Sequence, residues 1–237
     1  RGDTVAFVRA STMERFASAC VVSVKRLTDR TVEVAFDRDI PKELELNHDC
    51  VENISCTPEV EIRNCYFTRT STRGTLMTTP RKVIIANNTY YKTGMSAILI
   101  EGDAEGWYES GPVKDVLIQN NIFIDCAYNG GPEYAVIALN PSNTIIDAAH
   151  PVHRNVRIIG NTFQTFGNPV LYAKSTEGLV FKDNKVTSTP LPGGALQKPV
   201  FILNGSKNVT IKDNILKGTF RENIVFRNMK KLSLIHI

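Results

Sequence analysis

Residues 101–111 (EGDAEGWYESG) concentrate the residue types that could do chemistry. Within eleven residues they hold four carboxylates, three glycines, one tyrosine and the only tryptophan of the chain. Apolar runs precede this stretch at 97–100 and follow it at 116–118, and each is short enough to be a buried strand. A long acidic and aromatic loop between two buried strands costs chain entropy, so it is typical of a functional loop.

Three kinds of site fit this composition. The first is a solvated surface loop without chemistry. The second is a calcium site, because hard cations take carboxylate oxygens and the spacing of Glu101, Asp103 and Glu105 suits them loosely, although no Gly/Asp nonapeptide repeat accompanies it. The third is carbohydrate chemistry, in which two carboxylates act on a glycosidic bond and an aromatic ring packs against the sugar. Trp107 and Tyr108 beside the acids favour the third.

The loop lies within a repeat that runs from residue 59 onward. Each unit is a short β-branched strand, an Asn and an apolar residue two positions later, with the Asn at 64, 88, 121, 161, 184 and 214. The shortest steps are 24 and 23 residues, typical of a parallel β-helix in which each coil carries about three strands and coils stack about 4.8 Å apart. We interpret the Asn as structural, because it tolerates a left-handed bend and can form a side-chain ladder. A leucine-rich repeat would need a regular leucine consensus, which this sequence lacks.

A second series of apolar strands predicts where the loop projects. These strands, at 75–77, 97–100, 136–139, 170–173 and 200–203, follow the Asn bends at a similar distance. The 101–111 loop comes directly after one of them, and the next coil has extra residues at 127–133 and 140–150. Excess chain therefore collects at the corners of two successive coils. Such adjacent loops form a concave wall on a smooth solenoid, which is the candidate site.

The first fifty residues have a different pattern. Short β-branched runs at 4–8, 21–24 and 31–36, with a hairpin connection at 27–30, predict a small antiparallel sheet or barrel. We assign residues 1–52 to this module, as a structural module or lid in preference to a binding module, and residues 53–237 to the coils. Residues 231–237 continue no repeat. We therefore expect the chain to be truncated there, and residues 233–237 to be foreign to the native protein.

Composition excludes several classes of function. The chain has 237 residues, a net charge of +4 and scattered Lys and Arg, so it lacks a nucleic-acid footprint. No apolar run approaches the roughly 18 residues that a membrane span needs. Its five cysteines, Cys20, Cys50, Cys56, Cys65 and Cys126, show no metal-ligand spacing and are interpreted as free thiols.

Four motifs resemble the α-galactosidases of glycoside hydrolase family 110. They are residues 57–65 (TPEVEIRNC), 78–83 (TTPRKV), 94–100 (GMSAILI) and 107–111 (WYESG). The likeness extends over nearly the whole chain, and the N-terminal module is similar to the small barrel inserted in that family's β-helix. The resemblance therefore implies a right-handed parallel β-helix with an antiparallel β-barrel-like module, an all-β fold.

The resemblance also implies a function. The family consists of exported bacterial exo-enzymes that remove terminal α-1,3-linked galactose from glycans by an inverting, metal-free mechanism. A secreted or periplasmic location, a galactose-terminated glycan as partner and no cofactor are therefore expected. The motifs place the catalytic residues at Asp103, Glu109 and Glu101, with Asp103 as acid or base and Glu109 as its partner or as a contact to a sugar hydroxyl. Trp107 is expected as the sugar platform or a buried anchor, and the further residues expected to bind substrate are Tyr108, Arg73 and Glu133.

Two departures keep other functions open. Family members are more than twice as long as this chain, so part of the cleft is expected to be missing. The coil after the loop reads Leu139-Asn140-Pro141-Ser142-Asn143, without an acid. The alternatives are therefore a catalytically incomplete glycan-binding or structural β-helix module, and a calcium-dependent polysaccharide lyase with Lys or Arg as base.

Overall fold

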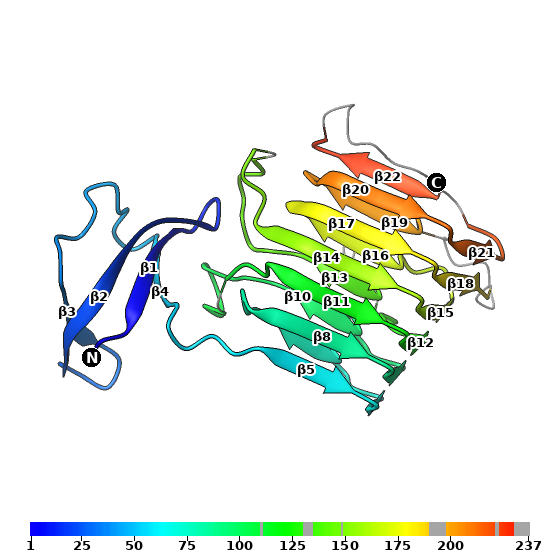
Figure 1. Cartoon of the computed structure of the whole chain (residues 1–237), viewed down its shortest axis with the longest axis horizontal. Coiled ribbons are helices and arrows are strands. Elements are labelled where there is room, and N and C mark those ends of the chain that lie inside the picture. Colours follow the sequence, from blue (N-terminus) through cyan, green and yellow to red (C-terminus); the bar gives the residue numbers. More distant parts are fainter. Residues whose placement is uncertain (110, 130–134, 148, 190–197, 221–222, 230–237) are drawn as a thin grey trace.

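The computed structural model describes residues 1–109, 111–129, 135–147, 149–189, 198–220 and 223–229, and these form strands, turns and loops. A small sheet at the N-terminus leads into a stack of parallel coils (Figure 1). The all-β expectation is thus confirmed. Among the described residues, no helix has the length and apolar character needed to cross a membrane.

The N-terminal sheet is antiparallel, with the strand order β3-β2-β1-β4. Its strands are β1 (Thr4–Arg9), β2 (Glu14–Arg26), β3 (Val32–Phe36) and β4 (Cys50–Asn53). The predicted hairpin is present, since the Leu27 amide donates to the Thr31 carbonyl at 3.0 Å. β2 is longer than its β-branched core at 21–24 indicates, and β4, which lies outside the three predicted runs, pairs with β1.

Three parallel sheets of six strands each form the coils. The first sheet contains β5 (Val60–Arg63), β8 (Lys82–Ala86), β11 (Asp115–Gln119), β14 (His153–Ile159), β17 (Thr176–Lys182) and β20 (Lys207–Lys212). The second contains β6 (Tyr66–Thr68), β9 (Thr89–Tyr91), β12 (Ile122–Ile124), β15 (Thr162–Thr165), β18 (Lys185–Ser188) and β21 (Ile215–Lys217). The third contains β7 (Thr75–Met77), β10 (Ile98–Ile100), β13 (Ile137–Leu139), β16 (Leu171–Lys174), β19 (Phe201–Asn204) and β22 (Ile224–Arg227).

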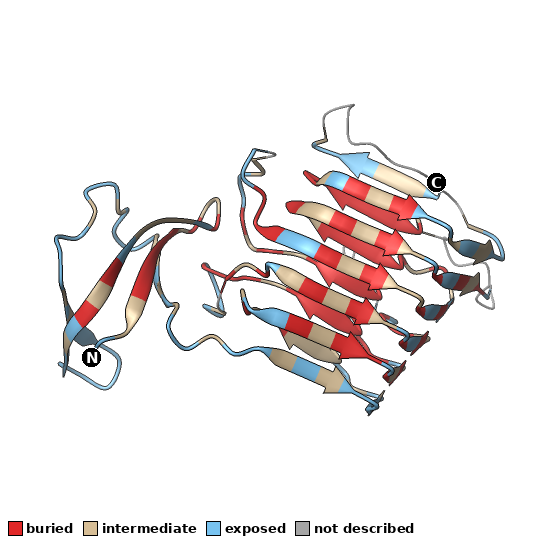
Figure 2. Ribbon diagram, in the orientation of Figure 1, coloured by how far each residue is buried: buried red, intermediate tan, exposed pale blue. Residues whose placement is uncertain are grey.

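The three sheets enclose one apolar core. In register, Val83, Val116, Val156, Leu179 and Val209 line the inside of the first sheet, and all are fully buried. Figure 2 shows this as buried segments repeated from coil to coil. Aromatic rings stack along the same axis, with Tyr90 between Phe67 at 4.6 Å and Phe123 at 5.2 Å. A parallel sheet buried on its inner face needs such repeated apolar positions, so the alternation in the sequence follows directly from the coil.

An asparagine ladder runs along one corner of the coils, between the first and second sheets. Asn88, Asn121, Asn161, Asn184 and Asn214 pass side-chain hydrogen bonds from coil to coil at 3.0–3.1 Å. Each Oδ1 also accepts the backbone N–H of the preceding coil's ladder residue at 2.8–2.9 Å. The first four of these side chains are about 1% exposed. The predicted structural role of these five residues is therefore confirmed.

The left-handed bend predicted for the Asn series is present at Asn64 but not at the five ladder residues, where it lies one residue earlier. The predicted ladder role was wrong for Asn64. Cys65, not Asn64, occupies the ladder position of the first coil, since its N–H donates to Asn88 Oδ1 at 2.9 Å. Asn64 precedes the ladder and has φ of 54°, as does its counterpart Asn87 with φ of 57°. The left-handed bend and the ladder are thus two adjacent positions. A sequence containing Asn-Asn at several corners cannot distinguish the two roles by residue type alone.

The insertions follow the third sheet, as predicted. Residues 101–114 connect β10 to β11, and residues 140–152 connect β13 to β14. The predicted insertion at 127–133 and the predicted foreign tail at 233–237 lie wholly or partly outside the described residues. Because the strands of the third sheet are in register, both described insertions leave the same edge of the same sheet. The fold therefore brings them together.

The ladder generates a stability prediction. Asn161→Ala removes the acceptor of the Asn121 N–H and Nδ2 groups and leaves buried donors unpaired. We expect a loss of roughly 2–4 kcal/mol in the free energy of unfolding, measured by urea denaturation. The control is Asn223→Ala at an exposed position, with a change within about 0.5 kcal/mol. An equal free energy of unfolding in Asn161→Ala and wild type would contradict a stabilising role of the ladder.

Candidate active site

The two insertions meet in direct contact. The Ser142 N–H donates to the Gly102 carbonyl at 2.9 Å, and the Ala104 N–H donates to Ser142 Oγ at 3.1 Å. The coil without an acid in its 139–143 segment thus supports the acidic loop through its backbone and hydroxyl. The concave wall that the repeat predicts is therefore formed by two loops that are joined by hydrogen bonds.

Asp103 closes the acidic loop. Its N–H donates to the Glu109 carbonyl at 3.0 Å, and its carboxylate accepts the N–H groups of Glu105, Gly106 and Trp107 at 2.7–2.9 Å. Burial raises the pKa of Asp103, but these three backbone hydrogen bonds outweigh it, so the net pKa is lowered. The contacts describe a carboxylate that shapes the loop. The catalytic role predicted for Asp103 stays a prediction.

Glu101 has an environment that raises its pKa, in contrast to that of Asp103. It follows β10 directly and extends the strand ladder by one residue, since its N–H donates to the Met77 carbonyl at 3.2 Å. Its pKa is raised, first by burial and then by the negative charge of Glu109, while Arg73 and Lys174 lower it. A carboxyl group with a raised pKa stays protonated to higher pH, which is the property that a general acid needs.

Glu109 is the second carboxylate of the site. Its Oε1 accepts a hydrogen bond from the Arg73 guanidinium at 3.3 Å, and the two side chains are 23% and 31% exposed. Its Oε2 is buried and has no hydrogen-bond partner among the described residues. A buried carboxylate oxygen without a hydrogen bond from the protein is costly, and a ligand hydroxyl or water would satisfy it. Glu101, Glu109 and Arg73 are thus brought together, and the roles predicted for them stay predictions.

Sequence reasoning missed two further residues near the insertions. Lys174 ends β16 and donates to the Pro141 carbonyl at 2.8 Å, and its charge acts on Glu101. His153 begins β14 beneath the insertions, and its Nδ1 accepts the Val113 N–H at 3.3 Å. Extending the strand register from Ile100 through Leu139 to Ala173 would place Lys174 level with Glu101, two coils or about 10 Å away. No comparable signal marks His153.

The aromatic residues of the loop are at its surface. Trp107 is 82% exposed and Tyr108 is 69% exposed, so the buried-anchor alternative for Trp107 is excluded and the sugar-platform role stays a prediction. Tyr108, Glu109 and Asp103 line a hollow of about 240 Å³ between the loop and the N-terminal sheet. Glu133 lies outside the described residues.

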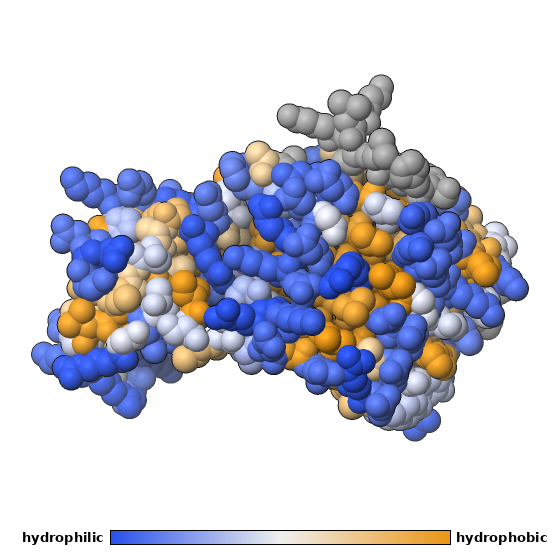
Figure 3. All heavy atoms as spheres, viewed as in Figure 1, coloured by the Kyte–Doolittle hydropathy of each residue, from blue (hydrophilic) through white to orange (hydrophobic). Residues whose placement is uncertain are grey.

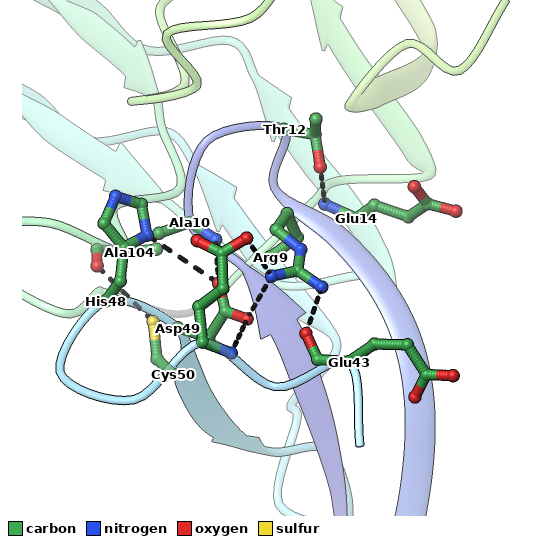
Figure 4. A network of polar contacts seen from close by, with 10 residues as sticks. Arg9, Ala10, Thr12, Glu14, Glu43, His48, Asp49, Cys50 and Ala104 are labelled. Atoms are coloured by element: carbon green, nitrogen blue, oxygen red, sulfur yellow. Dashed lines mark hydrogen bonds and ion pairs between the residues drawn. The ribbon is translucent and has the colours of Figure 1, made fainter. Parts of the chain in front are cut away.

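The N-terminal module contains a further group of acidic side chains. Glu45, His48 and Asp49 lie close enough to hold a cation, the one such group in the part of the chain described. The guanidinium of Arg9 already pairs with Asp49 at 2.7 Å and Glu45 at 2.8 Å (Figure 4). The positively charged Arg9 guanidinium therefore balances the charge of these carboxylates. The network fixes the loop that precedes β4.

The contacts of Asp103 predict an acid-sensitive loop. Because its pKa is lowered in the folded state, its stabilisation is present above its ordinary value of 3.8 and is lost as pH falls through the lower folded value. We expect the amides of Glu105, Gly106 and Trp107 to exchange faster with solvent in Asp103→Ala at pH 6, by roughly tenfold or more. Hydrogen exchange followed by NMR measures this, with Glu105→Gln as the exposed carboxylate control. Unchanged exchange would contradict the loop-closing role.

The burial of His153 predicts a pH-dependent stability. Burial, with a contribution from Lys174, lowers the pKa of this imidazole from 6.5 to about 3. The unfolded chain therefore binds a proton that the folded chain does not, and stability falls as pH drops below 6.5. Between pH 7 and pH 5 the loss is about 2 kcal/mol by linkage. His153→Gln should remove this contribution to the difference in the free energy of unfolding between pH 7 and pH 5, measured by urea denaturation. An unaltered difference in the variant would contradict a buried, neutral His153 imidazole.

Comparison with known proteins agrees with this architecture. Residues 1–51 match the model of the GLAA-B β-barrel domain II, and residues 47–231 match the model of the right-handed β-helix region. The coils described above are therefore right-handed.

Several curated relatives match most of this chain in sequence. An α-1,3-galactosidase A of Bacteroides fragilis is 69% identical over 99% of this chain and 39% of its own length. An α-1,3-galactosidase B of Bacteroides thetaiotaomicron is 37% identical over 99% of this chain and 38% of its own length. An α-1,3-galactosidase B of Akkermansia muciniphila is 35% identical over 90% of this chain and 27% of its own length. The chain spans less than two fifths of the length of these relatives. It belongs to the right-handed β-helix family and is homologous to proteins named α-1,3-galactosidase, as its motifs indicate.

Proposed function

We propose that this chain carries the acid–base pair of an exo-acting, inverting α-1,3-galactosidase, with Glu101 as general acid and Glu109 as general base. The substrate is a glycan or glycoconjugate with a terminal α-1,3-linked galactose. Support comes from the relatives named as α-1,3-galactosidases and from the two carboxyl groups beside each other at the edge of the third sheet.

One observation carries the assignment of roles. Burial and the neighbouring Glu109 carboxylate raise the pKa of Glu101, the property that a general acid needs. Glu109 accepts a hydrogen bond from the Arg73 guanidinium at 3.3 Å, and its other oxygen is left to accept a proton from water. The acid protonates the glycosidic oxygen as that bond breaks, and the base takes a proton from the water that attacks the anomeric carbon from the opposite face.

The other residues of the site support sugar binding. Glu109 Oε2 and the Arg73 guanidinium offer an acceptor and donors for sugar hydroxyls. Trp107 offers an exposed ring for the apolar face of a pyranose. Hydrophilic and hydrophobic residues are interspersed on the face shown in Figure 3. Because terminal galactose of glycoconjugates lies outside cells, we also propose an exported protein.

The calcium-dependent alternative has less support. Asp103, the centre of the expected cation spacing, already accepts three N–H groups, so calcium would have to compete with the loop's own hydrogen bonds. A glycan-binding module without catalysis is an outcome of the experiment that follows.

Hydrolysis of a chromogenic α-galactoside and of an α-1,3-linked galactose disaccharide tests the proposal. We expect galactose release with inversion, seen by NMR as the β-anomer first, and insensitivity to chelator. Glu101→Gln and Glu109→Gln should each lower kcat by about 10²–10⁴-fold, because general acid–base catalysis contributes on that scale. Glu105→Gln, an exposed carboxylate in the same loop, is the matched control.

The rate should also fall as pH rises through the pKa of Glu101, since the acid must be protonated. Saturable galactoside binding without turnover would support a binding module instead. Full activity of both variants would contradict the assigned pair.

A further inference from the structure

The N-terminal sheet touches the acidic loop on both sides of Glu109. Cys50 Sγ donates to the Ala104 carbonyl at 3.4 Å, and Glu52 Oε1 accepts the Gly111 N–H at 3.1 Å. Figure 4 shows Cys50 reaching from β4 toward Ala104. Both contacts come from one strand that lies about fifty residues earlier in the sequence.

Glu52 is held rigidly for this contact. Arg15 of β2 donates to both of its carboxylate oxygens at 2.7 Å, and the two side chains are 19% and 9% exposed. A bidentate, nearly buried guanidinium–carboxylate pair is well oriented and strong. Oε1 therefore faces Gly111 from a fixed position.

The lack of a side chain at Gly111 leaves room for Arg15 and Glu52. A Cβ added there would lie 3.0 Å from Arg15 Nη2 and 3.0 Å from each oxygen of Glu52. At the other end of the loop, Gly102 approaches Gly111 so closely that its Cβ would meet the Gly111 backbone at 3.4 Å. The two loop ends thus meet where Glu52 binds.

A second contact region fixes the tip of the module against the insertions. Ala10 and Met13 of the β1–β2 turn pack with Ala104 and Val152, and the Ile145 N–H donates to the Ser11 carbonyl at 2.9 Å. The module therefore contacts both insertions, and Glu52 is its charged contact with the acidic one.

We propose that Glu52, oriented by Arg15, is a positioning residue that fixes Glu109 beside Glu101, so that the N-terminal module is part of the active site. One residue separates Glu109 from Gly111, whose N–H makes this contact. A misplacement of about 1 Å can cost a catalytic group on the order of 100-fold in rate. The catalytic consequence rests on the proposed function, whereas the positioning does not.

The pKa of Glu101 reports the position of Glu109, because the charge of the Glu109 carboxylate raises it. We would follow the ¹³Cδ resonance of Glu101 against pH in wild type, Glu52→Gln and Gly111→Ala. Glu52→Gln replaces an acceptor with a donor facing Arg15 or Gly111, and Gly111→Ala displaces the loop without changing any charge. Both should lower the Glu101 pKa, and both should speed exchange of the loop amides by roughly tenfold.

Two controls separate positioning from general damage. Asp37→Asn removes a module carboxylate that binds the Cys20 N–H away from the loop, and it should leave the Glu101 pKa unchanged. In the Glu109→Gln background, Glu52→Gln and Gly111→Ala should have no further effect on that pKa. An unchanged Glu101 pKa in the single variants, or an equal shift in the Glu109→Gln background, would overturn the proposal.

Kinetics separate this proposal from the proposed function. If wild type hydrolyses α-galactosides, both variants should lose roughly tenfold or more in kcat with KM changed less, while Asp37→Asn keeps its rate. If wild type hydrolyses none, the proposed function fails and the Glu101 titration still decides whether Glu52 positions Glu109. A kcat equal to wild type in both variants would overturn the positioning role.

Discussion

The register of the coils is the constraint on which the site depends. The asparagine ladder and the backbone hydrogen bonds fix each coil over the next, so equivalent positions of successive coils lie about 4.8 Å apart. Any insertion after a strand of the third sheet must leave the same edge. Residues 101–114 and 140–152 do so from adjacent coils, and their meeting follows from the stacking more than from their own sequences.

Two acids of the 101–111 loop, Asp103 and Glu101, have opposite pKa shifts. Asp103 accepts three backbone N–H groups and gives the loop its shape, and Glu101 is raised in pKa by burial and by Glu109. The shaped loop carries Glu109 back toward Glu101 and Arg73, where its second oxygen has no hydrogen-bond partner in the described chain. The N-terminal sheet reaches the same loop through Cys50 and Glu52. The N-terminal module and the coils thus meet at the acidic loop.

The repeat pattern predicted the coils well, because residues in a parallel stack obey a local rule at every turn. For the same reason it predicted that the 101–111 loop leaves the third sheet beside a second insertion. It misplaced the first ladder member, since adjacent Asn residues serve the bend and the ladder, and Cys65 occupies the ladder position without an amide. It did not find Glu52, Lys174 or His153, because their contacts join residues 33 to 59 positions apart and depend on how corners and the module pack. Nor does residue type distinguish Asp103, bound by amides, from Glu101, buried beside another acid.

The measurement that tests the central claim most directly is a crystal structure of the chain with galactose bound. We predict that the anomeric carbon lies between the carboxyl groups of Glu101 and Glu109, which are about 6.5–9.5 Å apart. Glu109 Oε2 should form a hydrogen bond to the sugar, or to a water on the face of the sugar opposite Glu101. Galactose bound elsewhere, or Asp103 and not Glu101 beside the anomeric carbon, would contradict it.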